Sequence, residues 1–210
     1  MRVILTGAEY VGKSALAEAL RVWGLEHGFR FHMDDHFTIP DNSLRTDEER
    51  RYAQEAPPAM KERFQRFQIH YHLRLLQKYD DICLVGFHSE EAVYGPRYYY
   101  GRPVPQDYHR QIEPEMPRDT LYCLLTAHPD RLRERRRAAP HEYELVPEGD
   151  LEAVRTDFER EFTACWIKRK FRLDTSELSL DQLLPAFLAV AKGFMTERDL
   201  LRLQAYGAAT

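Results

Sequence analysis

Residues 7–14 read Gly7-Ala8-Glu9-Tyr10-Val11-Gly12-Lys13-Ser14, a complete match to the G-x-x-x-x-G-K-[ST] pattern of a phosphate-binding loop. The match is preceded by the apolar run Arg2-Val3-Ile4-Leu5-Thr6 and followed by the strong helix former Ala15-Leu16-Ala17-Glu18-Ala19-Leu20. A strand, a loop and a helix in this order are the context in which the pattern binds a nucleoside triphosphate. We therefore predict a phosphate-binding loop at the carboxyl end of the first strand.

Each part of this loop has an expected physical role. Glycines let backbone N–H groups turn inward and hold phosphate oxygens at the N-terminus of a helix. Lys13 is expected to reach the β- and γ-phosphates of ATP, and the Ser14 hydroxyl to ligate Mg²⁺. The predicted cofactor-binding residues are Gly7, Ala8, Glu9, Tyr10, Val11, Gly12, Lys13, Ser14 and Ala15. The alternative is a glycine-containing turn that binds no phosphate.

The composition limits the class of protein. A chain of 210 residues is long enough for one well-buried α/β domain. Its net charge of −4 gives no reason to expect binding to nucleic acid or to a membrane, and no apolar run is long enough to span a bilayer. The three cysteines are widely separated within apolar runs, which predicts reduced core residues. We therefore expect a cytoplasmic protein without a signal peptide and leave a homodimer open.

Five short β-like runs alternate with helical segments along the chain. They cover residues 2–6, 30–33, 82–87, 121–126 and 171–173. The third and fourth runs are apolar almost throughout, as expected for strands that helices cover on both faces. Alternating strands and helices favour βαβ units and a parallel sheet. We therefore predict a single domain over residues 1–210, a three-layer α/β/α P-loop NTPase fold with a five-stranded parallel sheet.

Two other classes of phosphate-loop protein fit the sequence poorly. Switch GTPases of the Ras type need a D-x-x-G motif, and no glycine in this chain has an aspartate three positions before it. The base-reading motif N-K-x-D is also missing; the nearest match is Gln77-Lys78-Tyr79-Asp80. An ATPase core usually ends one strand with an aspartate, whereas here the third run leads into Gly86-Phe87-His88-Ser89-Glu90-Glu91. These observations favour a small-molecule kinase over a switch protein.

The remaining signals resemble the nucleoside and nucleotide kinase group of P-loop proteins along nearly the whole chain. Met33-Asp34-Asp35-His36-Phe37 is similar to the Asp-Asp-Phe-Tyr segment of uridine kinases and phosphoribulokinases, in which a carboxylate accepts the proton of the acceptor hydroxyl. Phe67-Gln68 followed by Tyr71 resembles the deoxynucleoside kinase helix whose glutamine reads a base edge. Ala127-His128-Pro129-Asp130-Arg131 looks like the start of the arginine-bearing lid of nucleotide kinases, and Leu173-Asp174-Thr175-Ser176 like a common closing pattern. Residues 39–58 are polar and end in Pro57-Pro58, and residues 94–117 are rich in Pro, Gly and Tyr, which is typical of lid or acceptor-binding insertions and equally of ordinary surface loops. The lid resemblance implies a further insertion near residues 130–149.

The same segments also depart from these families. His88-Ser89-Glu90-Glu91 stands where deoxynucleoside kinases have Glu-Arg-Ser, and the Asp-Arg pair of thymidylate kinases is missing there. The identity of the acceptor therefore stays open.

Two aspartates are the candidate general bases. Asp34 and Asp35 are expected near the carboxyl end of the second strand, where open α/β sheets bind ligands. A carboxylate there can orient and deprotonate a hydroxyl acceptor. Because neighbours on a strand point to opposite faces, one of the two is expected to act, and we favour Asp35 without excluding Asp34. The alternative for both is a solvated acidic turn.

Five arginines lie within residues 131–137. A run of charge on a helix is usually a solvated face, but guanidinium groups bind phosphate oxygens bidentately. From the lid resemblance, we expect Arg135 and Arg136 to stabilise the transferring phosphoryl group.

Further residues complete the predicted acceptor site. Glu90 and Glu91 are candidates for binding substrate, and Glu90 with Ser14 for binding Mg²⁺; the alternative is a pair of helix-start carboxylates that the helix dipole favours. Phe64 and Gln68 could line the acceptor pocket, although an aromatic stripe at helical spacing can equally belong to the core. A tyrosine-rich segment that could close over the substrate contains Tyr94, Arg97, Tyr98, Tyr99, Tyr100 and Arg102.

Taken together, the sequence predicts an ATP-dependent kinase that acts on a small acceptor, in the first place a nucleoside or nucleotide. One alternative is a kinase of a sugar or another metabolite on the same fold. The other is a regulatory ATP-binding protein that hydrolyses ATP slowly and signals to a partner.

Overall fold

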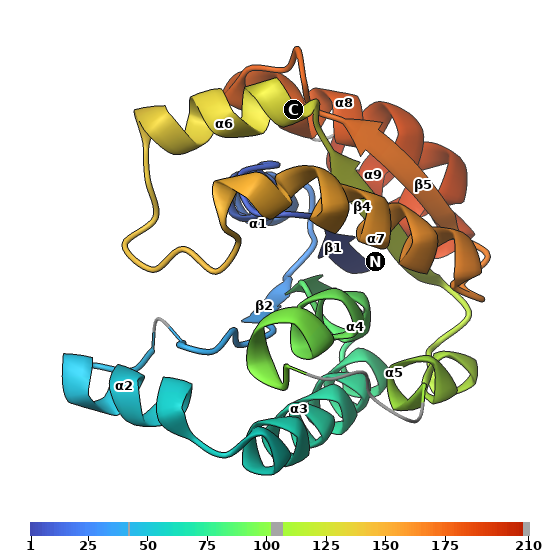
Figure 1. The fold of residues 1–210 in the computed structure, drawn as a ribbon. Helices are drawn as coiled ribbons and strands as arrows, with labels where there is room; N and C mark the ends of the chain where they lie inside the picture. The colour runs from blue at the N-terminus through green and yellow to red at the C-terminus, as the bar shows by residue number, and fades with distance from the viewer. Residues whose placement is uncertain (42, 102–106, 208–210) are drawn as a thin grey trace.

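Five parallel strands form a sheet in the order β2-β3-β1-β4-β5 (Figure 1). The computed structural model describes residues 1–41, 43–101 and 107–207, so Arg102 lies outside the described residues. The strands are β1 (Arg2–Thr6), β2 (His32–Asp35), β3 (Ile82–Val85), β4 (Thr120–Thr126) and β5 (Lys170–Asp174). Every neighbouring pair is parallel. The predicted α/β class and five-stranded parallel sheet are confirmed.

Helices cover both faces of this sheet. On one face α1 packs against β1, β3 and α8; on the other, α3 packs on β3 and α7 on β4, with α4 against α7. The α-helices are α1 (Lys13–Glu26), α2 (Asp47–Glu55), α3 (Pro58–Lys78), α4 (His88–Tyr94), α5 (Tyr108–Gln111), α6 (Pro129–Ala138), α7 (Leu151–Ala164), α8 (Leu180–Ala191) and α9 (Glu197–Gly207). The other helical elements are the π-helix η1 (Gly95–Tyr99) and the 3-10 helices η2 (Glu113–Glu115), η3 (Glu148–Asp150) and η4 (Lys192–Phe194).

The central strands carry the core because helices exclude water from both of their faces. All four residues of β3 are buried, as are six of the seven residues of β4. Cys83, Cys123 and Cys165 are buried and free, as predicted. Within the described ranges, none of the helices combines the length and the apolar composition needed to cross a membrane.

The strand register brings the predicted site segments to one edge of the sheet. Leu5 of β1 and Asp35 of β2 both pair with Val85 of β3, so these strands end at the same level. The phosphate loop, the end of β2 and the start of α4 therefore meet at the carboxyl edge, where sheets of this type bind ligands. Asp34 and Asp35 are the last two residues of β2, which begins two residues later than the sequence predicts.

The aromatic stripe of α3 faces outward. Phe64 and Phe67 are 49% and 70% exposed, whereas Ile69 and Leu73 on the other side are buried. The interpretation of this stripe as core is wrong because the sheet-facing side of α3 takes a different set of residues. Three polar members of that set, Gln65, Gln68 and His72, are buried because they bind or contact the chain that follows β2.

Candidate active site

The phosphate loop has the backbone shape that its glycines allow. Gly7 has a φ of 141°, and a Cβ atom added there would lie 2.2 Å from the carbonyl oxygen of Leu125, so a side chain has no room. The Lys13 ammonium donates to the carbonyl oxygens of Gly7 and Ala8, at 2.5 and 3.2 Å, and pairs with Glu90 at 3.4 Å. The Ser14 side chain at the start of α1 is exposed to solvent. The loop thus presents one cation and one open hydroxyl at the edge of the sheet.

Two side chains of the loop hold the segment that follows α6. The Glu9 carboxylate accepts hydrogen bonds from the backbone N–H groups of Leu145 and Val146, at 3.1 and 3.0 Å. The Tyr10 hydroxyl donates to Glu144 at 2.6 Å. Burial and the hydrogen bond to Glu144 raise the pKa of Tyr10 to about 12. Glu9 and Tyr10 therefore fix the segment after α6 against the phosphate loop.

Asp34 and Asp35 have different surroundings. Asp34 accepts hydrogen bonds from the backbone of Asp35 at 2.9 Å and from the Tyr71 hydroxyl at 3.3 Å. Burial raises the pKa of Asp34, but the combined effect of the His72 imidazole 3.8 Å away, the Asp35 N–H and His32 outweighs it, so the net pKa is lowered. The Asp34 carboxylate is thus engaged with α3.

Asp35 instead interacts electrostatically with Lys13 of the loop and with the Glu90 carboxylate. The Asp35 side chain is exposed on one side, but the protein atoms around its carboxyl group still remove part of its hydration, and the charge of Glu90 adds to this effect. The pKa of Asp35 is therefore raised to about 7, although Lys13 opposes the shift. A carboxyl group with a pKa near neutrality is suited to accept a proton from a hydroxyl.

Glu90 and Glu91 point to different partners. Glu90 is buried beside Lys13. A Cβ atom added at Gly86 would lie 1.9 Å from one of the Glu90 carboxylate oxygens, which is too close for any side chain. Gly86 has a φ of 83°, so glycine is needed there both for the backbone and for the space. One oxygen of Glu91 accepts hydrogen bonds from the hydroxyls of Tyr100 and Tyr108. Burial raises the pKa of Glu91 to about 7.

The other residues predicted to contact the acceptor differ in burial and in hydrogen bonding. Gln68 accepts a hydrogen bond from the Phe37 N–H at 3.1 Å and donates to Gln65 at 3.0 Å, so it holds the chain after β2. Phe64 is half exposed on the outer side of α3, and Tyr94 is fully buried. Their roles in binding an acceptor stay predictions.

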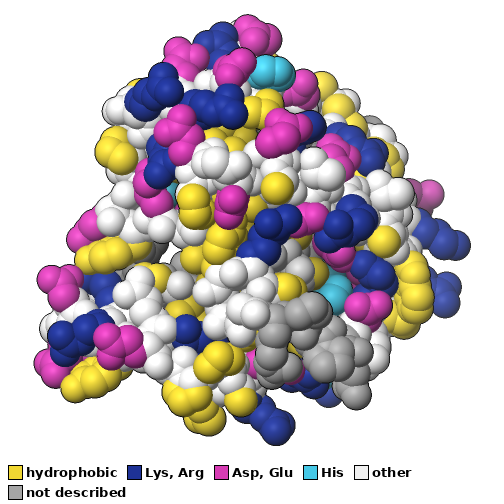
Figure 2. All heavy atoms as spheres, in the orientation of Figure 1, with side chains coloured by type: hydrophobic (Ala, Val, Ile, Leu, Met, Phe, Trp, Pro, Cys, Tyr) yellow, Lys and Arg dark blue, Asp and Glu magenta, His cyan; other side chains and the backbone are white. Residues whose placement is uncertain are grey.

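The two predicted lid arginines lie close to the phosphate loop. Arg135 donates to the backbone carbonyl of Tyr10 and to the Thr175 hydroxyl, both at 3.1 Å. Arg136 donates to Glu144 at 2.8 Å, and Glu144 in turn binds Tyr10. Figure 2 shows basic and acidic side chains intermixed over α6, and the remaining arginines of that helix pair with nearby carboxylates.

Thr175 is a site residue that the sequence did not single out by itself. Its hydroxyl donates to the Val11 carbonyl oxygen at 3.0 Å and is completely buried. The residue lies in the closing pattern after β5, and this pattern is the signal that could have found it. Thr175 and Arg135 together tie the β5–α8 turn to the phosphate loop.

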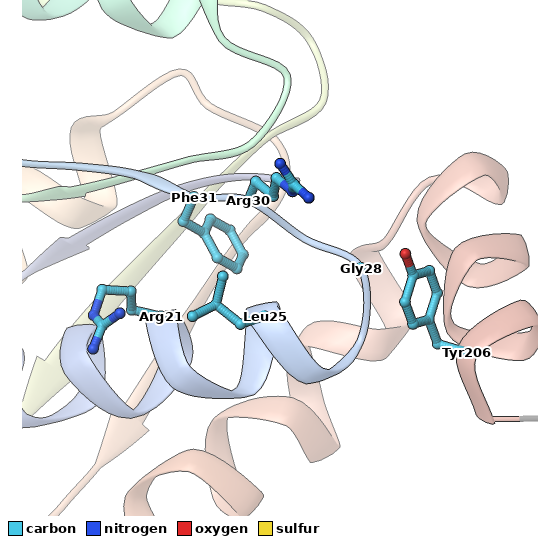
Figure 3. A pocket seen from close by; sticks show the side chains of 6 residues that line it. All are labelled: Arg21, Leu25, Gly28, Arg30, Phe31 and Tyr206. Atoms are coloured by element: carbon cyan, nitrogen blue, oxygen red, sulfur yellow. The ribbon is translucent and has the colours of Figure 1, made fainter. Parts of the chain in front are cut away.

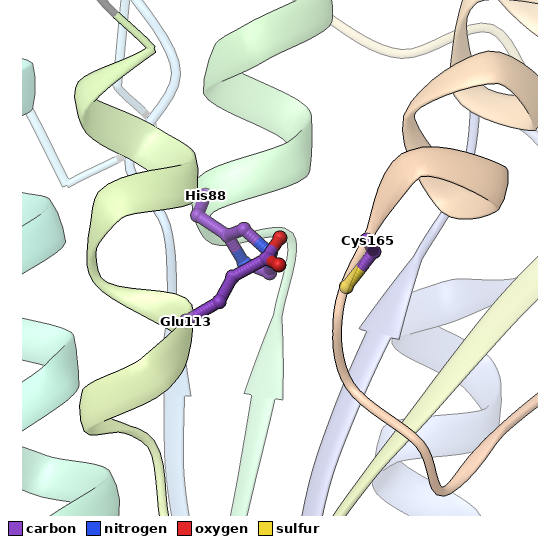
Figure 4. Close-up of side chains that lie close together, drawn as sticks. All are labelled: His88, Glu113 and Cys165. Atoms are coloured by element: carbon purple, nitrogen blue, oxygen red, sulfur yellow. The ribbon is translucent and has the colours of Figure 1, made fainter.

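His88 faces away from this edge, toward Glu113 and Cys165 (Figure 4). Its Nε2 atom lies 3.1 Å from a Glu113 oxygen, and the second oxygen accepts from the Trp166 N–H at 2.7 Å. These bonds connect the start of α4 to η2 and to the chain after α7. We interpret the cluster as a structural link.

A surface pocket of about 350 Å³ lies at the opposite end of α1 (Figure 3). It is lined by Arg21, Leu25, Gly28, Arg30, Phe31 and Tyr206. Because the 14 residues of α1 span about 21 Å at 1.5 Å each, this pocket is remote from Lys13.

Known structures share this architecture. A scan against protein-family models and a search of curated proteins each found no match. The chain is similar to the YorR protein of Bacillus subtilis, solved with phosphorylated GDP, with 16% identity, a TM-score of 0.62, and coverage of 94% of this chain and 100% of YorR. It is also similar to deoxyadenosine kinase from M. mycoides with bound dATP, with 14% identity, a TM-score of 0.61, and coverage of 91% and 100%. Thymidylate kinase from Candida albicans gives 13% identity, a TM-score of 0.59, and coverage of 91% and 90%. The chain therefore has the predicted P-loop kinase fold.

Proposed function

We propose that this protein is a kinase that transfers the γ-phosphoryl group of ATP to a small acceptor, in the first place a nucleoside or nucleotide. The observation that carries the proposal is the meeting of Lys13, Asp35 and Glu90 at one edge of the sheet. Phosphoryl transfer needs positioning and charge stabilisation more than covalent chemistry. A phosphate loop beside a carboxylate of near-neutral pKa offers both.

The residues present fit Mg²⁺. Ser14 offers an open hydroxyl at the loop, and Glu90 offers a carboxylate beside Lys13. Burial first and the charge of Glu90 second raise the pKa of Asp35, which indicates that these two carboxyl groups lie close together beside the loop. Ser14 and Glu90 are the proposed ligands, directly or through water, and the ion would offset charge on the phosphates.

In this proposal Lys13 and the loop amides bind the phosphates of ATP, and Asp35 takes the proton of the acceptor hydroxyl. Asp34 is retained as the weaker candidate because Tyr71 and His72 engage it. Arg135 and Arg136 are proposed to add positive charge from α6. The segments near residues 39–58, 94–117 and 130–149 are proposed as lid or acceptor-binding segments of one domain.

The proposed substrate-binding residues are Asp35, Phe64, Gln68, Glu90, Glu91 and Tyr94. A cytoplasmic location and a homodimer remain predictions. A kinase of a sugar or another metabolite, and a regulatory ATP-binding protein, are the alternatives that an activity test must separate.

The test is ADP release from ATP and Mg²⁺ across a panel of nucleosides, nucleotides and sugars. Lys13→Ala serves as the blank. Turnover that needs one acceptor and disappears in the blank supports a kinase and identifies its substrate. ATP hydrolysis that is indifferent to every acceptor would contradict the proposal and favour the regulatory alternative.

A further inference from the structure

Three side chains of metal-binding type meet in the interior of the protein. They are His88 at the start of α4, Glu113 in η2 and Cys165 directly after α7 (Figure 4). One ligand atom from each of the three lies within 4.8 Å of the other two. The residues come from three separate segments, so no spacing in the sequence predicts their meeting. We refer to them as the His–Glu–Cys cluster.

The geometry of the cluster fits a zinc ion. Zinc binds histidine nitrogen, carboxylate oxygen and thiolate sulfur at about 2.0–2.3 Å in a tetrahedral arrangement. Two ligand atoms on such an ion therefore lie about 3.3–3.6 Å apart. Nε2 of His88 lies 3.1 Å from a Glu113 oxygen, and the whole set spans no more than 4.8 Å. Small side-chain movements bring all three ligand atoms onto one ion.

The charge of the cluster also favours a cation. Glu113 is 7% exposed, and its one ion-pair partner in the described part of the chain is His88 rather than a lysine or an arginine. Burying a carboxylate is costly unless charge or hydrogen bonds compensate it. A doubly charged ion with the Glu113 carboxylate and a Cys165 thiolate makes a neutral site. The mixed nitrogen, oxygen and sulfur donors suit zinc better than Mg²⁺ or Ca²⁺.

A buried hydroxyl beside the cluster is a second, independent observation. Tyr122 is completely buried, and the centroid of its ring lies 5.8 Å from that of His88. Its hydroxyl has no hydrogen-bond partner among the residues that the structure describes. Buried polar groups are nearly always hydrogen-bonded. A polar group that the described chain does not supply is therefore expected at this place, and zinc with three protein ligands holds a water molecule in its fourth position.

We propose that the His–Glu–Cys cluster binds a structural zinc ion, through Nε2 of His88, one oxygen of Glu113 and Sγ of Cys165, with water in the fourth position. On binding, the Cys165 thiol proton is released to solvent, because a coordinating thiol is deprotonated, and the imidazole proton of His88 moves to Nδ1. The ion fastens the start of α4 to η2 and to the chain after α7.

This site is separate from the proposed Mg²⁺ ligands. His88 and Glu90 are two positions apart on α4, which places them about 200° apart around the helix axis. Glu90 lies beside Lys13 of the phosphate loop, whereas His88 lies against Glu113. Zinc therefore acts on the catalytic edge only through the position of α4.

Burial suits a structural ion. Such an ion is enclosed by its ligands and binds as the surrounding segments come together, so the site needs no open cavity. Cys165 lies in the irregular chain between α7 and β5, and the next residue, Trp166, is 63% exposed. Opening of this short stretch gives zinc a path to the sulfur while the sheet stays intact.

The test uses the wild-type protein, which is stripped with a chelator and then dialysed against Zn²⁺ in millimolar Mg²⁺. We expect one tightly bound zinc ion per chain by metal analysis and a rise in Tm of at least about 5 °C. Co²⁺ in place of zinc should give the near-ultraviolet absorption of a sulfur-to-cobalt bond. Absence of bound zinc, displacement by Mg²⁺, or a cobalt spectrum without the sulfur band would overturn the proposal.

Two variants locate the ion. Cys165→Ala and Glu113→Gln should each weaken zinc binding at least about tenfold, and Cys165→Ala should also remove the sulfur band. Cys123→Ala removes another buried, free cysteine and is the matched control, which should bind zinc as the wild type does. Equal zinc binding by the two alanine variants would overturn the assignment. The wild-type measurements decide the question even if Cys165→Ala does not fold, and neither arm depends on kinase activity.

Discussion

The phosphate loop and the acceptor side, which we define as Asp35, His36, Glu91 and Tyr94, lie on either side of Glu90 but differ in how fully their polar groups are paired. In the loop, Lys13 is held by two backbone carbonyl oxygens and Glu90, and Thr175 supports the Val11 carbonyl. On the acceptor side, Asp35 has a raised pKa, and His36, Glu91 and Tyr94 keep buried atoms without described partners. The loop is held by its own backbone and by paired side chains, whereas the acceptor side keeps buried polar atoms without described partners and a carboxyl group with a raised pKa. In the proposed kinase, we expect the loop to bind ATP in the absence of an acceptor, because its shape depends on its own backbone and glycines.

The largest effect is expected from removing the cation of the loop. Lys13→Ala should lower acceptor-dependent turnover by on the order of 10²–10³-fold, because a preorganised charge at the transferring group is lost. Steady-state ADP release measures the effect. Lys192→Ala removes an exposed lysine of η4 and serves as the control. Similar activity of Lys13→Ala and Lys192→Ala would show that Lys13 contributes no more to turnover than an exposed lysine elsewhere.

The next effect concerns the contact between the two regions at Glu90. Gly86→Ala places a methyl group on the Glu90 carboxylate and forces a residue with a side chain to adopt a φ of 83°. We expect a loss of about 1–3 kcal/mol in the free energy of unfolding, together with weaker turnover. Urea titration measures the first quantity. Gly149→Ala, where an added Cβ meets nothing within 4 Å, should change neither. Equal stability of both variants would show that Glu90 is not held at this position.

The smallest effect is expected at the loop's contact with the segment after α6. Tyr10→Phe keeps the ring stacked on His141 but removes the hydroxyl bonds to Glu144 and from the His141 N–H. Loss of these bonds should cost about 1 kcal/mol and speed amide hydrogen exchange in residues 141–146. Tyr52→Phe on α2 is the control. Unchanged exchange would show that the Tyr10 hydroxyl does not hold the segment.

The two regions also differ in how well the sequence predicts them. The loop is predictable because its residues are adjacent in the chain and each glycine has a local backbone role. The acceptor side is assembled from β2, α3, α4 and η1, and its contacts depend on which face each helix turns inward. The Phe64–Phe67 stripe illustrates the difficulty. Its spacing predicts a helix correctly, but buried Gln65 and Gln68 take the inner face because they bind the backbone of Phe37 after β2.

Asp34 and Asp35 illustrate the same limit within one strand. Alternation predicts that they face opposite ways but does not say which of them faces the loop. The packing of Tyr71 and His72 against Asp34 decides this, and it depends on the tertiary placement of α3. The function of Glu9 in holding Leu145 and Val146 also could not be predicted, because those residues are far away in the chain.

The most direct test of the central claim is the pH dependence of kcat/KM for the wild-type protein, Asp35→Asn and the matched variant Asp34→Asn. A general base works in its deprotonated form, so with a pKa raised to about 7 the wild-type rate should rise as the pH increases through about 7 and then level off. Asp35→Asn should lose this rise and at least about 10²-fold in rate while still binding ATP, and Asp34→Asn should keep the rise. Full activity with an unchanged pH profile in Asp35→Asn would contradict the assignment of Asp35 as the base.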